Sequence, residues 1–294
     1  MTAPTSAAPD AMIASAIARA GQLATLPEIA LEVMRVAEDP QSTGDDLNRV
    51  LSTDPALSAR ILKMVNSAYY GVRREVTSIG TAIGLLGFAA IKSIAIAASL
   101  TRMFRGGSVG GGFEARELWR HSIAVGTAAR ALARAVHGID PSDAFLAGLM
   151  HDIGIVVELQ ACRDAFGAAI AAVASDDTLS FLDAESQHLG ATHEAFGLAL
   201  CTSWRFPPAL AIVTGHHHRP LLLAEDVGRL TALIHVADHL AARAALGYSR
   251  TVDGAGIDPL VLARLSLTTA DLEMVASTLE AQVADVFPLL TGEG

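Results

Sequence analysis

Apolar residues recur at helical spacing along most of this chain, and several of the apolar runs have readable ends. The clearest run is STDPALSARILKMVNSAYYG, residues 52–71, in which Asp54 can cap a helix, Pro55 occupies its first turn and Gly71 ends it. Aromatic residues make up only 5% of the chain, and few segments show the alternation that strands require. Because 51% of the residues are hydrophobic and available for a core, the sequence predicts an all-α protein.

The composition divides the chain into four parts. Residues 1–20 are small and contain two prolines, which predicts a flexible N-terminal tail. The segment RGGSVGGGF, residues 105–113, has too few side chains to pack and predicts a linker. Residues 21–104 and 114–288 are then two helical subdomains. Besides the helix at Pro55, helices are expected from Pro27 to Asp39 and at residues 117–136, 141–150, 153–175, 181–204, 207–216, 226–246 and 270–285.

One apolar segment resembles a membrane span. TAIGLLGFAAIKSIAIAASL, residues 81–100, is close to the roughly 20 residues that cross a bilayer. However, Lys92 lies in its middle, and Gly87 follows two leucines as at the end of a helix. The segment therefore predicts two short buried helices and no membrane partner.

Charge and cysteine content limit the possible partners and compartment. The net charge of −10 argues against a general nucleic-acid or anionic membrane surface, because such surfaces need clustered positive charge. Only Cys162 and Cys201 are present, and no basic-then-apolar secretory segment opens the chain. We therefore expect a cytoplasmic protein without a disulfide framework.

Several polar residues interrupt otherwise apolar helical stretches. In LAGLMHDIGIVVEL, residues 146–159, an acid follows a histidine, and burying a carboxylate there is costly unless a cation compensates it. Comparable positions are Glu117, His121, His151, Asp152, His193, His216 to His218 and Asp238. Imidazole nitrogens and carboxylate oxygens are the ligand set of Fe, Mn, Zn or Ni, and helices can bring such ligands together.

The spacing of these residues supports a shared site. Glu117 and His121 are four residues apart and so lie on one helical face. Any one histidine alone is more often an ordinary core or surface residue, but the combination favours a site. His235 and His239 have the same spacing, yet Arg243 continues their face, so we expect both to be solvated.

HDIG is accompanied by an upstream RHS helix and by longer characteristic phrases. These phrases are LPEIALEVMRVAEDP, LSTDPALSARILKMVNSAYYG, TSIGTAIGLLGFAAIKSIAI, LWRHSIAVG, AFLAGLMHDIGIVVEL and SWRFPPALAIVTGHHHRP. Through them the chain resembles the HDOD family of the HD superfamily of metal-dependent phosphohydrolases. This resemblance covers residues 22–245. It implies an N-terminal helical bundle packed on an HD-like helical core, in a module that regulates or signals.

The resemblance also implies a metal-ligand set. Compared with the HD-GYP cyclic-dinucleotide phosphodiesterases, the matching residues are Glu117, His121, His151, Asp152, His193, His217, His218 and Asp238. The three consecutive histidines leave the doublet open, although the His-His-x-Pro spacing favours His217 and His218. A divalent transition metal is implied, with Fe or Mn preferred, as one ion or as a dinuclear centre.

Two features of the active enzymes are missing. Ile155 stands where the lysine after HDIG would stabilise charge on a phosphate, and RPLLLAED replaces the Gly-Tyr-Pro stretch. The leading hypothesis is a non-catalytic signalling module that binds a partner protein, or a nucleotide or phosphate ligand, and can hold metal. The alternative is a metal-dependent phosphohydrolase. A third hypothesis is an interaction protein whose pocket holds no metal.

Tyr69 and Tyr70 end a helix and combine apolar area with a polar tip. They are candidate exposed anchors for a partner of the N-terminal half. The competing interpretation, that both rings pack between the two halves, is retained at equal weight.

Overall fold

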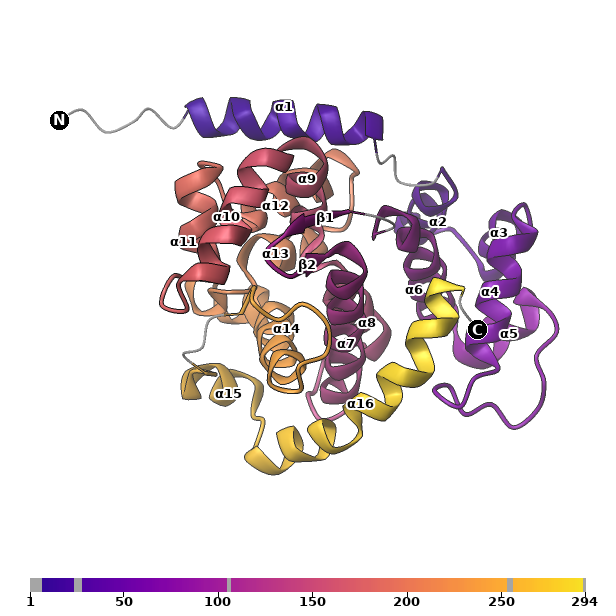
Figure 1. Ribbon diagram of the computed structural model, residues 1–294. Helices are drawn as coiled ribbons and strands as arrows, with labels where there is room; N and C mark the ends of the chain where they lie inside the picture. Colours follow the sequence, from indigo (N-terminus) through magenta and orange to yellow (C-terminus); the bar gives the residue numbers. More distant parts are fainter. Residues whose placement is uncertain (1–6, 24–27, 105–106, 253–255, 293–294) are drawn as a thin grey trace.

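The computed structural model describes residues 7–23, 28–104, 107–252 and 256–292, and its elements are almost entirely helical (Figure 1). The expected all-α fold is therefore confirmed. The first half contains α1 (Ala7–Leu23), α2 (Glu28–Glu38), α3 (Gly44–Leu51), α4 (Pro55–Val65), α5 (Ile79–Leu86), α6 (Phe88–Leu100) and the 3-10 helix η1 (Thr101–Phe104). The second half contains β1 (Ser108–Gly110), β2 (Phe113–Glu114), α7 (Ala115–Ala133), α8 (Pro141–Met150), α9 (Ile153–Ala161), α10 (Arg163–Ser175), α11 (Phe181–His188), α12 (His193–Ser203), α13 (Pro208–His216), η2 (Pro220–Leu222), α14 (Glu225–Arg243), α15 (Pro259–Leu265) and α16 (Thr269–Thr291).

Local signals set several of the expected helix boundaries. The Asp54 side chain accepts a hydrogen bond from the Leu57 amide at 2.9 Å and so caps α4. The segment at 81–100 forms two helices, α5 and α6, which meet at Gly87 with a φ of 86°. Lys92 lies in α6, and its ammonium group pairs with the Asp143 carboxylate, 2.8 Å away at the start of α8. The charge that argued against a membrane span is thus paired with a carboxylate at the partly exposed start of α8.

Two long helices that the sequence predicts are each broken in two. The helix expected at 153–175 breaks at Cys162, whose φ of −127° separates α9 from α10. The helix expected at 181–204 breaks between α11 and α12, where Gly190 adopts a φ of 78°. At both breaks the chain changes direction between two helices. Apolar periodicity alone does not reveal such breaks, because the pattern is helical before and after them. Helices α3 and α15 were not expected.

The expected flexible tail at residues 1–20 is wrong for the part that the structure describes. Residues 7–23 form α1, which lies across α9 and α12 (Figure 1). Ile13 and Ala16 are buried, since they lie on one helical face against these two helices. Residues 1–6 fall outside the described part of the chain.

The glycine-rich segment at 105–113 is more ordered than a linker over its described residues. From residue 107 on, it forms a small antiparallel hairpin of β1 and β2, in which Gly110 pairs with Phe113. The Phe113 ring is fully buried, with its centroid 4.9 Å from that of Phe166 and 5.0 Å from that of Tyr248. One aromatic residue therefore anchors a segment that otherwise has few side chains to pack.

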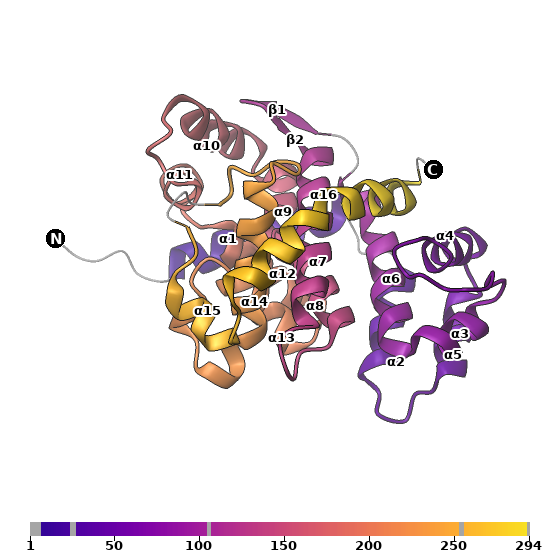
Figure 2. The same cartoon turned by 90° about the horizontal axis from the view of Figure 1, so that it is seen from below.

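The two halves of the chain are joined by helices from both (Figure 2). Helix α6 packs on α8, and α16 runs from the second half across α7 to α4 and α6. Thr101 donates a hydrogen bond to the carbonyl of Leu290 at 3.0 Å, which fixes the end of α16 against the first half. Helices α1 and α16 both cross the boundary between the two halves, so the division into subdomains 21–104 and 114–288 stays a prediction.

Tyr69 and Tyr70 pack between the two halves and so agree with the second interpretation of these residues. The ring centroid of Tyr69 lies 6.3 Å from that of Phe145 in α8. The guanidinium carbon of Arg130 in α7 lies 4.5 Å from the centroid of Tyr69 and 4.2 Å from that of Tyr70. The two tyrosines thus bind the end of the α4 segment to the second half.

One described stretch, Pro141–Ala161, has the length and hydropathy of a membrane-spanning helix. It consists of α8 and α9, and 89% of its most apolar window is buried within the protein. Its apolar character is accounted for by this burial.

Candidate metal centre

Six helices of the second half carry or flank the histidines and aspartates that lie in its interior. His121 lies in α7, His151 and Asp152 lie between α8 and α9, and Asp238 lies in α14. His193 begins α12, and His217 and His218 follow α13. Six of these residues are at most 1% exposed, and His218 is half-buried.

Two glycines allow the helices to approach closely enough. A Cβ at Gly148 in α8 would lie 2.6 Å from the Cα of Gly126 in α7, so contact between these helices requires glycine. A Cβ at Gly154 in α9 would lie 2.0 Å from the His193 carbonyl oxygen. These contacts place His121 beside His151, and Asp152 beside His193. The glycine of the HDIG sequence therefore positions the site through backbone packing.

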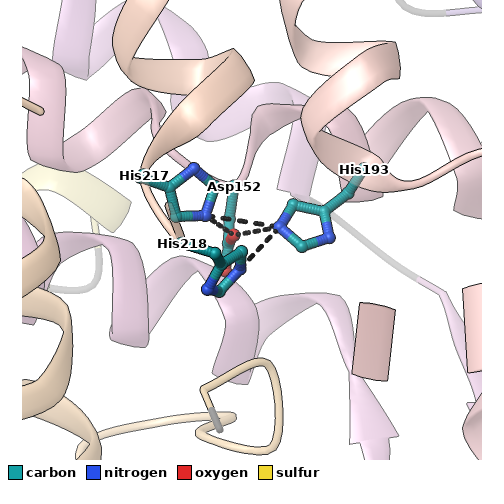
Figure 3. A group of neighbouring side chains, drawn as sticks. All are labelled: Asp152, His193, His217 and His218. Carbon is teal, nitrogen blue, oxygen red and sulfur yellow. Dashed lines mark hydrogen bonds and ion pairs between the residues drawn. The ribbon is translucent and has the colours of Figure 1, made fainter. Parts of the chain in front are cut away.

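The first set of donors, the His193 group, consists of Asp152, His193, His217 and His218, whose donor atoms all lie within 4.8 Å of one another (Figure 3). Oδ1 of Asp152 is 3.3 Å from Nε2 of His193 and 3.4 Å from Nε2 of His217. Nε2 of His193 is 3.0 Å from Nε2 of His218. Ligands bound to one ion at about 2.1 Å are separated by roughly 3.0 to 3.5 Å, so these spacings suit a shared ion.

The second set, the His121 group, consists of His121, His151 and Asp238. Nε2 of His121 lies 2.8 Å from Oδ1 of Asp238, and Nε2 of His151 lies 3.7 Å from the same oxygen. Asp152 joins the two groups, because its Oδ2 is 3.3 Å from Nε2 of His151 while its Oδ1 faces the His193 group. The two groups are therefore adjacent and can share one carboxylate.

Three buried atoms at this junction have no hydrogen-bond partner among the described residues. They are both carboxylate oxygens of Asp152 and Nε2 of His151. An unsatisfied buried polar atom costs free energy, and a divalent cation would satisfy all three at once. This observation fits a metal ion to the site more closely than it fits an ordinary polar core.

The far side of three imidazoles is held by acceptors, which leaves Nε2 pointing into the site. Nδ1 of His151 lies 2.7 Å from the Gly148 carbonyl oxygen, and Nδ1 of His193 lies 2.8 Å from a carboxylate oxygen of Glu185. Nδ1 of His217 lies 3.3 Å from the Val213 carbonyl oxygen. Such outer contacts select the tautomer in which Nε2 is free to bind a metal.

Without an ion, the charges of the site balance through protonated histidines. Burial would lower the pKa of His151, but the Asp152 and Asp238 carboxylates outweigh it and raise that pKa to about 9. In His193, burial is likewise outweighed, chiefly by Glu185, and the pKa is again raised to about 9. Burial would raise the pKa of Asp152, yet the facing imidazoles hold it well below its ordinary value. The same carboxylates that retain these protons would attract a divalent cation.

Glu117 lies outside both groups. It shares the helical face of His121 as predicted, but its side chain is 35% exposed and lies 4.0 Å from Arg120. His216 is also outside, with Nδ1 3.1 Å from the Ile212 carbonyl oxygen, while His217 and His218 both belong to the His193 group. The geometry thus agrees with the His-His-x-Pro spacing.

The expectation that His235 and His239 are solvated is wrong. They are 9% and 7% exposed, and their ring centroids are 4.6 Å apart. Nδ1 of His235 lies 2.8 Å from the carbonyl oxygen of His217, so this residue supports the segment that carries the doublet. Together with His218, the two rings line a cavity of about 370 Å³ beside the site. Arg243 continues their sequence spacing but lies at the exposed end of α14.

Three acids that support the site were missed at the sequence level. Glu185 holds His193, and Glu194 accepts from the His218 amide at 3.2 Å while pairing with Arg219. Glu158 in α9 is fully buried, and both of its carboxylate oxygens lack a partner among the described residues. Glu158 could have been recognised, because it interrupts the same apolar run as His151 and Asp152.

Glu158 predicts a measurable pH dependence of stability. Burial and the adjacent Glu185 carboxylate raise the pKa of Glu158 well above 4.5, so the folded protein keeps this proton while the unfolded chain loses it above pH 4.5. Stability is therefore lost as the pH rises toward the folded pKa. Because glutamine mimics the protonated acid, Glu158→Gln should be more stable than wild type near pH 8 and similar to it near pH 5. Urea unfolding at both pH values checks this, and an equal difference at the two would contradict it.

A helical protein with an HD pair at a helix junction, faced by further histidines and a distant aspartate, has the architecture of the HD superfamily. The HDOD domain model matches residues 23–220, and the chain belongs to the HDOD family. The resemblance on which the ligand set was assigned is thereby confirmed at the level of the family.

Solved structures agree with this fold over nearly the whole chain. An HDOD protein of unknown function from Geobacter sulfurreducens is 22% identical, with a TM-score of 0.77 over 96% of this chain and 97% of its own. A Shewanella amazonensis SB2B protein, provisionally assigned as a phosphohydrolase, is 25% identical, with a TM-score of 0.72 over 94% and 98%. A Marinobacter aquaeolei VT8 protein, provisionally assigned to signal transduction, is 20% identical, with a TM-score of 0.76 over 97% and 66%.

Among curated proteins, the chain is similar to an uncharacterised protein of Treponema pallidum (strain Nichols). The two are 26% identical over 213 residues, which is 71% of this chain. The match spans 40% of the length of that relative.

Proposed function

We propose that this HDOD protein is a cytoplasmic signalling module that binds a divalent transition metal in its HD-like core and acts by binding a partner protein. The observation that carries the proposal is the pair of adjoining donor groups joined by Asp152, whose two oxygens lack other partners among the described residues. The proposed ligands are His121, His151 and Asp238 at one position and His193, His217 and His218 at the other, with Asp152 between them. Mixed nitrogen and oxygen donors suit Fe or Mn, the two metals that the resemblance implies.

A regulatory role is supported by what surrounds the donors. Ile155 is fully buried one turn after the HD pair, so that position offers no cation to a phosphate. His121, His151, Asp152, His193 and His217 are all 0% exposed, and only His218 lines the neighbouring cavity. An ion so little accessible to solvent is suited to stabilising one conformation that a partner protein recognises. The neighbouring cavity is where a small nucleotide or phosphate ligand could approach the ion.

A metal-dependent phosphohydrolase is the second candidate. It is favoured by the near-complete ligand set and by the provisional assignment of the Shewanella amazonensis structure. A bound metal would supply an activated water and a Lewis acid. Asp152 and the histidines would orient that ion, and turnover would require a substrate to reach it past His218.

Metal analysis and an activity assay on the same preparations separate these candidates. We expect freshly purified wild type to contain one or two Fe or Mn ions per chain by mass spectrometry, and Asp152→Ala to contain almost none, since Asp152 is common to both positions. Pure wild type should not hydrolyse phosphodiester substrates, cyclic dinucleotides included. Hydrolysis that is lost in both His151→Ala and Asp152→Ala would contradict the non-catalytic proposal, and metal-free wild type would contradict the metal site.

A further inference from the structure

A second polar cavity lies between the two halves of the protein and shares no lining residue with the metal donors. It has a volume of about 160 Å³ and is bounded by the end of the α4 segment, by α7 and by α16. The polar side chains that line it are Tyr69, Thr127, Arg130, Arg134, Gln282 and Asp285. Two arginines thus face one carboxylate in a protein whose net charge is −10.

Arg130 is held in a fixed position but keeps free donors. Its guanidinium lies against the rings of Tyr69 and Tyr70, at 4.5 and 4.2 Å from their centroids. Ring faces attract the positive charge but accept few of its hydrogen bonds. Nη1 of Arg130 is buried and has no hydrogen-bond partner among the described residues. The arginine is therefore oriented by the two rings and the Tyr69 hydroxyl, and the Asp140 carboxylate interacts with its charge without lining the cavity.

Two hydroxyl groups on the same cavity also have spare donors. Thr127 is 0% exposed, and its Oγ1 has no partner within the described chain. The hydroxyl of Tyr69 is buried beside the Arg130 guanidinium, which can donate to its oxygen, so the hydroxyl proton is left to be donated to a ligand. Buried polar groups normally use all their donors, and the spare donors of Thr127, Tyr69 and Arg130 on one cavity indicate a ligand that would supply acceptors.

We infer that this cavity binds a small oxyanion of the phosphate or sulfate class. A planar guanidinium, a second arginine and two hydroxyl donors match the several acceptor oxygens of such an ion. Asp285 is the carboxylate that lines the cavity, and it is exposed to solvent, so two arginines and one solvated carboxylate surround the space.

A bound anion would connect three parts of the protein that are distant in sequence. Tyr69 belongs to the first half, Arg130 lies in α7 with Arg134 directly after its end, and Gln282 belongs to α16. An ion that binds all three would hold α16 and the first half against α7. The cavity is thus placed to let a small anion change the stability of the contact between the halves.

The test is thermal unfolding and calorimetric titration of the full chain with inorganic phosphate, at ionic strength matched with chloride. Phosphate should raise the melting temperature of wild type, whereas chloride should not. Arg134 is exposed, so Arg134→Gln should fold normally but bind phosphate about tenfold more weakly, as expected for the loss of one charged hydrogen-bond donor. Asp285→Asn should bind phosphate more tightly, and Arg205→Gln, an exposed arginine elsewhere, should match wild type.

The source of the oxyanion is distinguished by a parallel titration with glycerol 3-phosphate. Tighter binding of the monoester, lost in Arg134→Gln, supports the terminal phosphate of a metabolite, and tighter binding of inorganic phosphate supports the free ion. Equal phosphate responses in Arg134→Gln and wild type would overturn the site, as would a wild-type response no larger than that to chloride. The metal content of Arg134→Gln should equal that of wild type, so failure here is separable from failure of the metal site.

Discussion

Chelation lowers the melting temperature of wild type by on the order of 10 °C and leaves that of His151→Ala unchanged; this is the largest effect that we expect from the metal centre. An ion that binds only the folded protein stabilises it by about 4 kcal/mol when present at a thousand times its dissociation constant. His151 is essential because its Nε2 faces both Asp152 and Asp238. Ligation also displaces protons from imidazoles, so proton release on metal addition should accompany stabilisation.

The matched control for this experiment is His216→Ala. His216 adjoins the doublet in sequence, but its ring contacts the Ile212 carbonyl and lies outside both donor groups. The variant should therefore keep the full response to chelator. Metal-free wild type whose stability does not change when Mn²⁺ or Fe²⁺ is added would contradict the prediction. So would equal responses in His151→Ala and wild type.

Gly154→Ala should destabilise the protein by about 3 kcal/mol or more and abolish metal binding. The new Cβ would lie 2.0 Å from the His193 carbonyl oxygen and 2.7 Å from the Gly197 amide nitrogen. Both are backbone atoms that cannot move aside individually, so α9 and α12 must separate. That separation would draw Asp152 away from His193.

Gly167→Ala provides the control for this substitution. Gly167 is also inside a helix, α10, but a Cβ there would meet its nearest atom, in Val109, at an ordinary 3.7 Å. This variant should be as stable as wild type or gain up to about 1 kcal/mol from the helix propensity of alanine. Chemical denaturation and metal analysis of both variants test the comparison. Normal metal content in Gly154→Ala would contradict the proposed role of this helix contact.

The parts of the fold that the sequence could predict depend on local chemistry. The cap and first turn of α4 are readable because Asp54 and Pro55 act within a single turn of helix. The parts that could not be predicted depend on tertiary contacts. Helix α1 is ordered by α9 and α12, which lie more than a hundred residues away, and Phe113 orders a segment whose glycines indicate a linker.

The candidate site also has features that the sequence could predict and features that depend on tertiary contacts. The structure brings together seven of the eight residues that the resemblance implies as ligands, and metal binding by them stays a prediction. Spacing misled at His235 and His239, because periodicity gives a shared face but not which face is buried. At Glu117 the shared face was right, but one turn before His121 that face is partly exposed. Glu185 could not have been foreseen, since nothing nearby in the sequence shows that His193 will lie against it.

The opposite ends of the described chain each pack on the other half, and this arrangement has a consequence for synthesis. Helix α1 is synthesised before α9 and α12, which it contacts, and α16 is synthesised after every other described helix but contacts α4 and α6. The nascent first half therefore leaves the exit tunnel without the helix that will cover it, and its apolar surface stays uncovered until α16 is made. Long chains usually fold one domain at a time during synthesis, but with this topology neither half can finish folding before the other is made. Neither half is completely packed until α16, the last of the described helices, has been synthesised.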